Sequence, residues 1–283
     1  MSSLPPPPKT LFGYDVVERL GEGAHSAIYV VSARKTGQLY ALKHVVPTEP
    51  KHVRFIEQIQ TEFAVSRTFR HPGLRKCIAL TLRKKYWLFG PVTEAAMVME
   101  LVDGVPLDVD LPAELPAVVD VFVKVAAALG ALHHYRYLHC DTKPNNILRD
   151  RHGAVRVIDF GQACLAGTRK ERIQGTPDFI APEQALCQTL EYPTDVYNFG
   201  ATLYWALTGG QRVPTMMNVS KDERQVVRDQ KYPAPADLNP KVPPALSKLV
   251  MECLKVAPAY RPQSMDEIIQ RLTPYGTGGA AKR

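Results

Sequence analysis

In the first third of the chain the apolar residues gather in short runs of strand length, a pattern typical of β-strands. The runs are YDVVERL, AIYVVSA, LYALKHVV and, later, AAMVMEL. One stretch between them, from about His52 to Phe69, instead has Phe55, Ile59 and Phe63 near helical spacing. The pattern therefore predicts a small β-rich lobe with one main helix over residues 14–102.

After Asp103 the apolar residues recur every three or four positions, as they do in amphipathic helices. The longest predicted helix runs from Leu115 to Tyr137. Shorter helices are predicted at Val196 to Leu207, Ala245 to Cys253 and Met265 to Leu272. Residues 103–272 should thus form a larger, mostly helical lobe, with a hinge near residues 100–105.

Both ends of the chain have the composition of tails. Residues 1–13 include four consecutive prolines, and proline lacks the N–H that a helix interior or a central strand needs. Residues 273–283 are rich in glycine. We expect both segments to be flexible.

Composition excludes several classes of protein. With 45% apolar residues among 283, the chain can form a sizeable core, which excludes wholesale disorder. Asp120 and Lys124 interrupt the longest apolar stretch, whereas a membrane span needs about 20 nearly uninterrupted apolar residues. The N-terminus does not resemble a secretion signal, and the five cysteines form no CxxC pair. We therefore expect a soluble, cytoplasmic protein with reduced thiols and no membrane segment in this chain.

The net charge of +7 weakly favours acidic or phosphorylated partners. A nucleic-acid surface would need basic residues clustered with aromatic ones, but here they are scattered along the chain. We therefore expect no nucleic-acid partner.

A glycine-rich segment lies between the first two long predicted strands. Gly21 and Gly23 have no Cβ, so the backbone there can lie close to a polyphosphate. By itself, Gly-x-Gly between strands is more often an ordinary hairpin turn. Lys43 ends the next strand, where its ammonium group could reach phosphates under the glycines, and Glu62 on the predicted helix is a candidate ion-pair partner.

Two later segments carry groups suited to catalysis and metal binding. In HCDTKPNN, the Asp141 carboxylate can orient a hydroxyl and accept its proton, while the Asn146 amide oxygen can bind Mg²⁺. Asp159 begins Asp-Phe-Gly directly after an apolar run, where a carboxylate is a natural metal ligand. Each of these two short motifs is common by chance. Their occurrence in this order, downstream of the glycines and Lys43, is not.

Together these motifs resemble the eukaryotic-type (Hanks-type) serine/threonine protein kinase family, including its bacterial members. The resemblance rests on GEGAHS, YALK, Glu62, HCDTKPNN, DFG, GTPDFIAPE, TDVYNFGATLYWALTGG and YRP, in the family's order from Tyr14 to Leu272. It implies an α+β, bilobal protein kinase fold. It also implies phosphate transfer from ATP with Mg²⁺, or alternatively Mn²⁺.

The resemblance further implies a role for each matching residue. The expected nucleotide site comprises Gly21, Glu22, Gly23, Ser26, Ile28, Ala41, Lys43, Glu62, Met99, Glu100, Val102, Asn146, Leu148 and Asp159. In it, Lys43 would hold the α- and β-phosphates and Met99 would be the gatekeeper. Backbone groups of Glu100 and Val102 would bind adenine, which would pack between Ile28 with Ala41 on one side and Leu148 on the other.

The remaining implied roles are catalytic or structural. Asn146 and Asp159 would bind the metal ions, Asp141 would position the acceptor hydroxyl, and Lys143 would steady the γ-phosphate. Three further residues resemble the family's structural ones, namely Glu183 paired with Arg261, and Asp195.

Lys143 and Thr176 match the serine/threonine-directed pattern, and Asn145 predicts no strong preference for arginine in the substrate. The alternatives are a pseudokinase that binds ATP as a scaffold, and a kinase for small-molecule hydroxyls. The intact motifs argue against the first, and GTPDFIAPE argues against the second. The oligomeric state stays open, with a regulatory dimer among the alternatives.

Three positions depart from the family pattern. Ser26 stands where many members have a third glycine, and a small side chain there should cost little. Cys140 replaces the arginine that usually pairs with a phosphate on the activation segment, so activity should not require phosphorylation near Thr168. Arg169, Lys170 and Arg172 could supply substitute charge. Ser66 stands where an apolar residue is usual. The sequence favours inert Cys140 and Cys164 over redox-sensitive ones.

Overall fold

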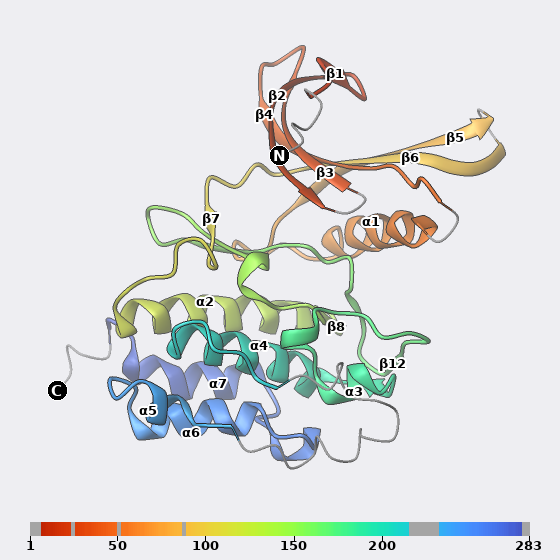
Figure 1. Ribbon diagram of the computed structural model, residues 1–283. Coiled ribbons are helices and arrows are strands. Elements are labelled where there is room, and N and C mark those ends of the chain that lie inside the picture. Colours follow the sequence, from red (N-terminus) through yellow and green to blue (C-terminus); the bar gives the residue numbers. More distant parts are fainter. Residues whose placement is uncertain (1–6, 24–25, 50–51, 87–88, 215–231, 279–283) are drawn as a thin grey trace, which may run out of the picture. The chain divides into compact units, whose positions relative to one another are not determined.

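The computed structural model describes residues 7–23, 26–49, 52–86, 89–214 and 232–278 (Figure 1). The chain divides into two compact units. The N-terminal unit comprises residues 1–70 and 75–103, and the C-terminal unit comprises residues 71–74 and 104–283.

This division differs slightly from the boundary predicted between residues 102 and 103. The N-terminal unit extends to Asp103, and residues 71–74 belong to the C-terminal unit. The reason is local pairing, because Val157 donates its N–H to the carbonyl of Gly73 at 2.7 Å and forms a parallel bridge with Leu74.

The N-terminal unit is built on a six-stranded antiparallel sheet in the order β1-β2-β3-β4-β6-β5. The strands are β1 (Thr10–Leu11), β2 (Tyr14–Gly23), β3 (Ser26–Ala33), β4 (Leu39–Val45), β5 (Cys77–Tyr86) and β6 (Phe89–Met99). Helix α1 (Val53–Ser66) packs against β5 and β6, as Figure 1 shows. Its buried Ile56 and Ile59 lie in one core with side chains of β4 and β6. The predicted β-rich lobe with a single main helix is confirmed.

Part of the tail predicted over residues 1–13 belongs to the sheet, and residues 1–6 of that prediction lie outside the described residues. Thr10 and Leu11 pair with Asp15 and Tyr14, so this part of the predicted tail is a strand of the sheet. The turn between the two strands uses backbone of positive φ at Phe12 (48°) and Gly13 (87°), which glycine adopts at little cost. The prolines occupy positions 5–8, ahead of this strand.

In its described residues the C-terminal unit has four main helices, α2 (Leu115–His134), α4 (Tyr192–Leu207), α6 (Pro244–Cys253) and α7 (Met265–Leu272). Helix α2 packs against α4 and α7, and α6 packs against the same two helices (Figure 1). Helix α4 begins four residues before the predicted Val196, since Pro193 is favourable in a first helical turn. Helix α2 ends before the predicted Tyr137, because Arg136 has φ 63°.

Short elements complete this unit. They are strands β7 (Val105–Pro106), β8 (Tyr137–Leu138), β9 (Ile147–Arg149), β10 (Val155–Val157), β11 (Cys164–Leu165), β12 (Thr168–Arg169) and β13 (Thr189–Leu190), and helices α3 (Pro182–Ala185) and α5 (Pro235–Leu238). Turns of 3₁₀ helix cover Pro144–Asn146, Pro177–Phe179, Pro258–Tyr260 and Thr273–Tyr275.

Helix α2 is long and apolar enough to cross a membrane by length and composition alone. Half of its most apolar window is buried within the unit, which is typical of a core helix. Its two charged interruptions have partners there. Lys124 donates to the carbonyl of Gly153 at 2.6 Å, and Asp120 accepts hydrogen bonds from Thr277. The Thr277 contact also anchors part of the tail predicted over residues 273–283.

Candidate active site

Strand register places Gly21 of the glycine-rich strand level with Lys43 across the sheet. Gly21 of β2 lies opposite Ile28 of β3, and Ile28 lies opposite Lys43 of β4. The backbone at Gly21 is therefore one strand away from Ile28 and two strands away from Lys43. Residues 24–25, at the tip of the glycine-rich segment, lie outside the described residues.

Gly21 is not required by the packing of the chain. A Cβ added there meets no atom within 4 Å, and its φ is not positive. A glycine without a structural reason in its own fold is consistent with space reserved for a ligand. Two other residues of the expected nucleotide site lie nearby. Glu22 pairs with Arg19 at 3.1 Å, and Ser26 lies opposite Gly23.

Lys43 and Glu62 form the predicted ion pair. The Lys43 Nζ lies 2.7 Å from Glu62 Oε2, and Glu62 has no exposed side-chain surface. The second carboxylate oxygen of Glu62 binds Arg75 at 2.8 Å. Each oxygen of the buried carboxylate thus binds a cation, so its charge stays compensated, and Lys43 is held at a fixed point of β4.

The residues predicted around adenine lie in both units. Ala41 and Met99 are directly opposite each other on β4 and β6 and belong to one core cluster. The N–H of Glu100 donates to the carbonyl of Lys76 at 2.9 Å. The carbonyl of Glu100 is therefore the backbone group left for the predicted contact with adenine. Val102 follows in an irregular segment of the N-terminal unit. Leu148 is half-buried in β9 of the C-terminal unit, and its contact with adenine stays a prediction.

Asp141 stands at the centre of a hydrogen-bonded group in the C-terminal unit. Its Oδ2 lies 3.0 Å from Lys143 Nζ, and its Oδ1 accepts a hydrogen bond from the Thr176 hydroxyl at 2.8 Å. Lys143 also donates to the Thr176 oxygen at 2.6 Å. The three side chains thus form a closed triangle that fixes the carboxylate where it could receive a proton.

The two predicted metal ligands are brought together by backbone pairing. Strands β9 and β10 pair with Ile147 opposite Val157, and the N–H of Ile158 donates to the carbonyl of Asn146 at 2.9 Å. Asn146, just before β9, and Asp159, just after β10, therefore flank the same end of this ladder. No group of three His, Cys, Asp or Glu suited to a metal ion occurs within the described ranges. The predicted cation site thus rests on this pair.

The side chains of this pair suit a hard cation such as Mg²⁺. Asn146 Nδ2 donates to Asp141, to its carbonyl at 2.8 Å and its Oδ2 at 3.3 Å, so the amide oxygen is the atom suited to a metal. Asp159 has φ 66°, which is uncommon for a residue other than glycine. Strained backbone of this kind costs about 1–3 kcal/mol and clusters at functional sites.

His139 links the segment 139–146, called the catalytic loop below, to the segment before Asp159. Its Nδ1 accepts the N–H of Asp141 at 3.2 Å, and its Nε2 lies 3.1 Å from the carbonyl of Ile158. Because a backbone N–H only donates and a carbonyl only accepts, the proton belongs on Nε2. The ring also packs edge-on against Phe160, with centroids 5.6 Å apart. His139 therefore positions Asp141 relative to Asp159.

Asp195 holds the same loop by accepting hydrogen bonds from its backbone. Its buried carboxylate accepts the N–H groups of His139 and Cys140, both at 2.8 Å, and binds His133 Nε2 at 2.9 Å. Burial by itself raises the pKa of Asp195, but the hydrogen bond from His133 and further favourable contacts outweigh it and lower the pKa overall. The predicted structural role for Asp195 fits these contacts.

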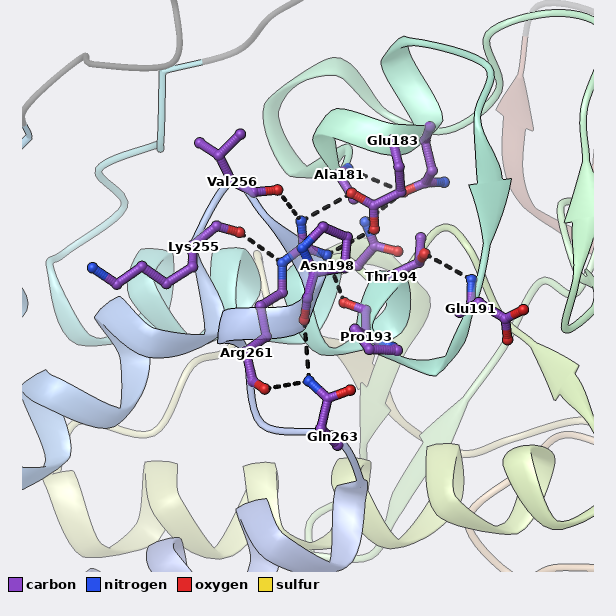
Figure 2. Close-up of polar contacts among 12 residues, drawn as sticks. Ala181, Glu183, Glu191, Pro193, Thr194, Asn198, Lys255, Val256, Arg261 and Gln263 are labelled. Carbon is purple, nitrogen blue, oxygen red and sulfur yellow. Dashed lines mark hydrogen bonds and ion pairs between the residues drawn. The ribbon is translucent and has the colours of Figure 1, made fainter.

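The other predicted structural pair is a saturated ion pair. Arg261 donates to both carboxylate oxygens of Glu183, at 2.7 and 2.9 Å, and Figure 2 shows the carbonyl groups that surround it. Neither side chain exceeds 3% exposure. Together they join the end of the activation segment to the segment before α7.

Several of these contacts involve residues to which sequence analysis assigned no such role. Arg75 is the second partner of Glu62, and His139 was quoted only as part of a motif. Gln184 is a third case, since its buried Nε2 donates to the Cys140 carbonyl at 2.8 Å. Arg75 carried no signal, because the strand that follows it, β5, was not among the predicted strands. His139 and Gln184 lie inside or next to the quoted motifs, and that position was the only signal they offered.

Comparison with known proteins supports one family. The family model described as "Protein kinase domain" matches residues 14–272. The DNA damage-responsive serine/threonine-protein kinase RqkA of Deinococcus radiodurans is 29% identical, over 92% of this chain and 39% of its own length. A probable serine/threonine-protein kinase of Clostridium perfringens is 27% identical, over 90% of this chain and 37% of its own length. PknD of Chlamydia pneumoniae, a serine/threonine-protein kinase, is 26% identical, over 90% of this chain and 30% of its own length.

This chain therefore spans well under half the length of the curated relatives it matches. The family match, however, covers nearly the whole chain and all the motifs discussed above. The bilobal architecture predicted from the sequence agrees with that family. The chain belongs to the protein kinase family.

Proposed function

We propose that this chain transfers the γ-phosphate of ATP to serine or threonine hydroxyl groups of protein substrates. The observation that carries the proposal is the triangle of Asp141, Lys143 and Thr176, which presents a carboxylate and an ammonium group in one place. The three relatives described above are named serine/threonine-protein kinases, which supports the same class of acceptor.

The residues of the two units would divide the work. Asp141 would orient the acceptor hydroxyl and take its proton, and Lys143, 3.0 Å away, would compensate the negative charge of the γ-phosphate. Lys43, fixed by Glu62, would bind the other phosphates. Asn146 and Asp159 would hold Mg²⁺, or alternatively Mn²⁺, which when bound neutralises phosphate charge. Catalysis would rest mainly on positioning and electrostatics.

The pseudokinase alternative is disfavoured by the state of these residues. Lys43, Asp141, Asn146 and Asp159 are all present, and each stands in a defined network or register. A small-molecule kinase is disfavoured by the segment from Gly175 to Glu183, which is tied to the catalytic loop through Thr176. That arrangement suits a platform for a peptide acceptor.

We further propose that activity does not require phosphorylation of the activation segment. Cys140 stands where a phosphate-binding arginine is usual, and its side chain is buried. Two of the nearby cations already bind main-chain carbonyls, Arg169 that of Cys187 and Lys170 that of Gln162. These contacts order the segment without a phosphate.

The direct test is transfer of labelled γ-phosphate to the protein itself and to a generic acceptor protein, followed by phosphoamino-acid analysis. Asp141→Asn should abolish transfer, whereas Asp150→Asn should retain it. Asp150 is a matched control because its carboxylate only caps a turn, by accepting the N–H groups of His152 and Ala154. Label on tyrosine alone, or equal transfer by both variants, would contradict the proposal.

The independence from phosphorylation needs its own experiment. Thr168→Ala and phosphatase-treated protein should both keep their transfer rate within about twofold of the untreated chain, as expected for a change away from the reacting groups. A loss of activity in either sample, with folding unchanged by circular dichroism, would show that a phosphate on this segment is needed.

A further inference from the structure

Two cysteines lie in contact beside the catalytic loop. The Sγ of Cys140 is 3.7 Å from the Sγ of Cys164. Strand pairing explains the contact, because Cys164 of β11 lies opposite Leu138 of β8, and Cys140 follows Leu138 by two residues. Cys140 directly precedes Asp141, and Cys164 lies in the activation segment. The pair therefore joins the two segments that the proposed phosphotransfer uses.

The two thiols differ in exposure. Cys140 is 1% exposed, whereas Cys164 is only partly buried and is followed by Leu165, which is half exposed. An oxidant from solvent therefore reaches Cys164 first. The hydrogen bond from Cys140 lowers the pKa of Cys164, and the positive charge of Lys170 acts in the same direction. A lower pKa increases the fraction of thiolate, which is the reactive form.

We propose that Cys140 and Cys164 form a reversible disulfide when a hydroperoxide oxidises the protein. In the first step, the Cys164 thiolate attacks one oxygen of the peroxide. The O–O bond breaks, the departing oxygen takes up a proton, and Cys164 becomes a sulfenic acid. In the second step, Cys140 loses its proton and attacks the Cys164 sulfur. The S–O bond breaks and water leaves.

The overall reaction is balanced. With hydrogen peroxide, two thiols lose two protons and two electrons, the peroxide is reduced, and two waters form. A small dithiol restores both thiols through thiol–disulfide exchange and is itself oxidised to a disulfide.

Closing this bond places strain on the segments that carry the two cysteines. The sulfurs have to approach from 3.7 Å to about 2.05 Å. Cys140 has little freedom to follow, because its N–H donates to Asp195 and its carbonyl accepts from Gln184, both at 2.8 Å. The strain therefore falls on the neighbouring Asp141 and on the activation segment around Cys164.

The consequence for activity rests on the proposed function. Misplacement of reacting groups by about 1 Å can cost up to about 100-fold in rate. We expect the oxidised protein to transfer phosphate about 10- to 100-fold more slowly than the reduced protein, by the same reasoning. The disulfide itself does not depend on that activity.

The test treats the whole chain with hydrogen peroxide alone and maps its peptides by mass spectrometry without reduction. The expected product is one linked pair of peptides, carrying Cys140 and Cys164, which dithiothreitol separates. Cys164→Ser should lose the link and the reversible loss of activity. Cys187→Ser is the matched control, because Cys187 is also a partly exposed thiol of this unit. The Cys187→Ser variant should retain both the peptide link and the reversible loss of activity.

Each other outcome would overturn the inference. Peroxide could add oxygen to Cys164 with no link, or link a different pair of cysteines. Cys164→Ser could also lose activity reversibly to the same extent as the parent chain. If the reduced, folded protein transferred no phosphate, the proposed function would fail. The peptide map would still decide whether the disulfide forms, so the two failures are distinguishable.

Discussion

Two buried glutamates, one in each unit, form ion pairs of different character. Glu62 of α1 divides its carboxylate between Lys43 and Arg75, at 2.7 and 2.8 Å. Glu183 of α3 gives both oxygens to a single residue, Arg261 (Figure 2). In both cases the carboxylate is buried, so the difference lies in the cations.

Arg261 is used completely inside the fold. Besides Glu183, its guanidinium donates to the carbonyls of Pro193, Lys255 and Val256, so all five N–H groups have acceptors. Lys43 instead keeps 15% of its side-chain surface exposed while it binds Glu62. A cation that is saturated within the fold serves stability, whereas one that stays partly exposed at a fixed point is suited to a ligand. The comparison therefore separates a structural ion pair from one that we propose is functional.

The largest expected effect comes from breaking the structural pair. Arg261→Met should lower the free energy of unfolding by about 3–5 kcal/mol, since it leaves the Glu183 carboxylate buried without a cation. Chemical denaturation measures the loss. Arg271→Met is the control, because Arg271 pairs with Glu252 and Glu267 at the surface and should cost about 1 kcal/mol or less. Equal losses in the two variants would remove the distinction.

The opposite result is expected for the functional pair. Lys43→Met should reduce phosphate transfer by about 100-fold or more, in line with loss of one preorganised charged group. Its cost in stability should stay below about 2 kcal/mol, because Arg75 still neutralises Glu62. Steady-state kinetics and denaturation of the same preparation measure both quantities. A large loss of stability with little loss of activity would reverse our assignment of the two pairs.

A third buried carboxylate, Asp195, sharpens the comparison through pH. Asp195→Asn should cost about 1–3 kcal/mol, because the amide can no longer accept from all three of its donors. The pKa of Asp195 is lowered in the folded protein, so its contribution is present above about pH 4, the ordinary range of a free carboxyl. It is lost as the pH falls through the folded-state pKa.

The variant should therefore show a shallower fall in unfolding free energy below about pH 4 than the parent chain. Denaturant melts at a series of acidic pH values would test this. Parallel curves for the two proteins would mean that Asp195 does not carry the acid sensitivity.

How much of the site could be predicted depended on how local each signal was. Lys43, Glu62, Asp141, Asn146 and Asp159 lie in short motifs whose residue types match the chemistry, and the structure gives each a defined partner or register. Strand and helix patterns likewise predicted the two lobes, because periodicity reflects which face is buried.

The contacts that could not be predicted depend on where the chain returns. Arg75 meets Glu62 only because the chain comes back past α1 before β5 begins. Thr10 and Leu11 form a strand because a tight turn at Phe12 and Gly13 reverses a short apolar segment, which was too short to show a period. Such contacts follow from tertiary geometry, and the sequence pattern carries little information about them.

Ser66 is the clearest case where the sequence pattern and the structure point to different roles. As a departure from the family pattern, its hydroxyl suggests weakened packing, so Ser66→Leu would be expected to raise basal activity. In the structure, Ser66 is buried and its Oγ accepts the N–H of Cys77 at 3.1 Å. The hydroxyl thus satisfies a buried donor at the start of β5, and leucine would leave that donor unpaired.

The smallest predicted effect follows from this hydrogen bond. Ser66→Ala should lower the unfolding free energy by about 1–2 kcal/mol, and Ser66→Leu should lower it further because the larger side chain must also fit a filled site. Ser32→Ala, at a partly exposed serine of β3, should change it by less than about 0.5 kcal/mol. A Ser66→Leu variant that is as stable as the parent and more active would show that packing, and not the bond to Cys77, determines the role of this position.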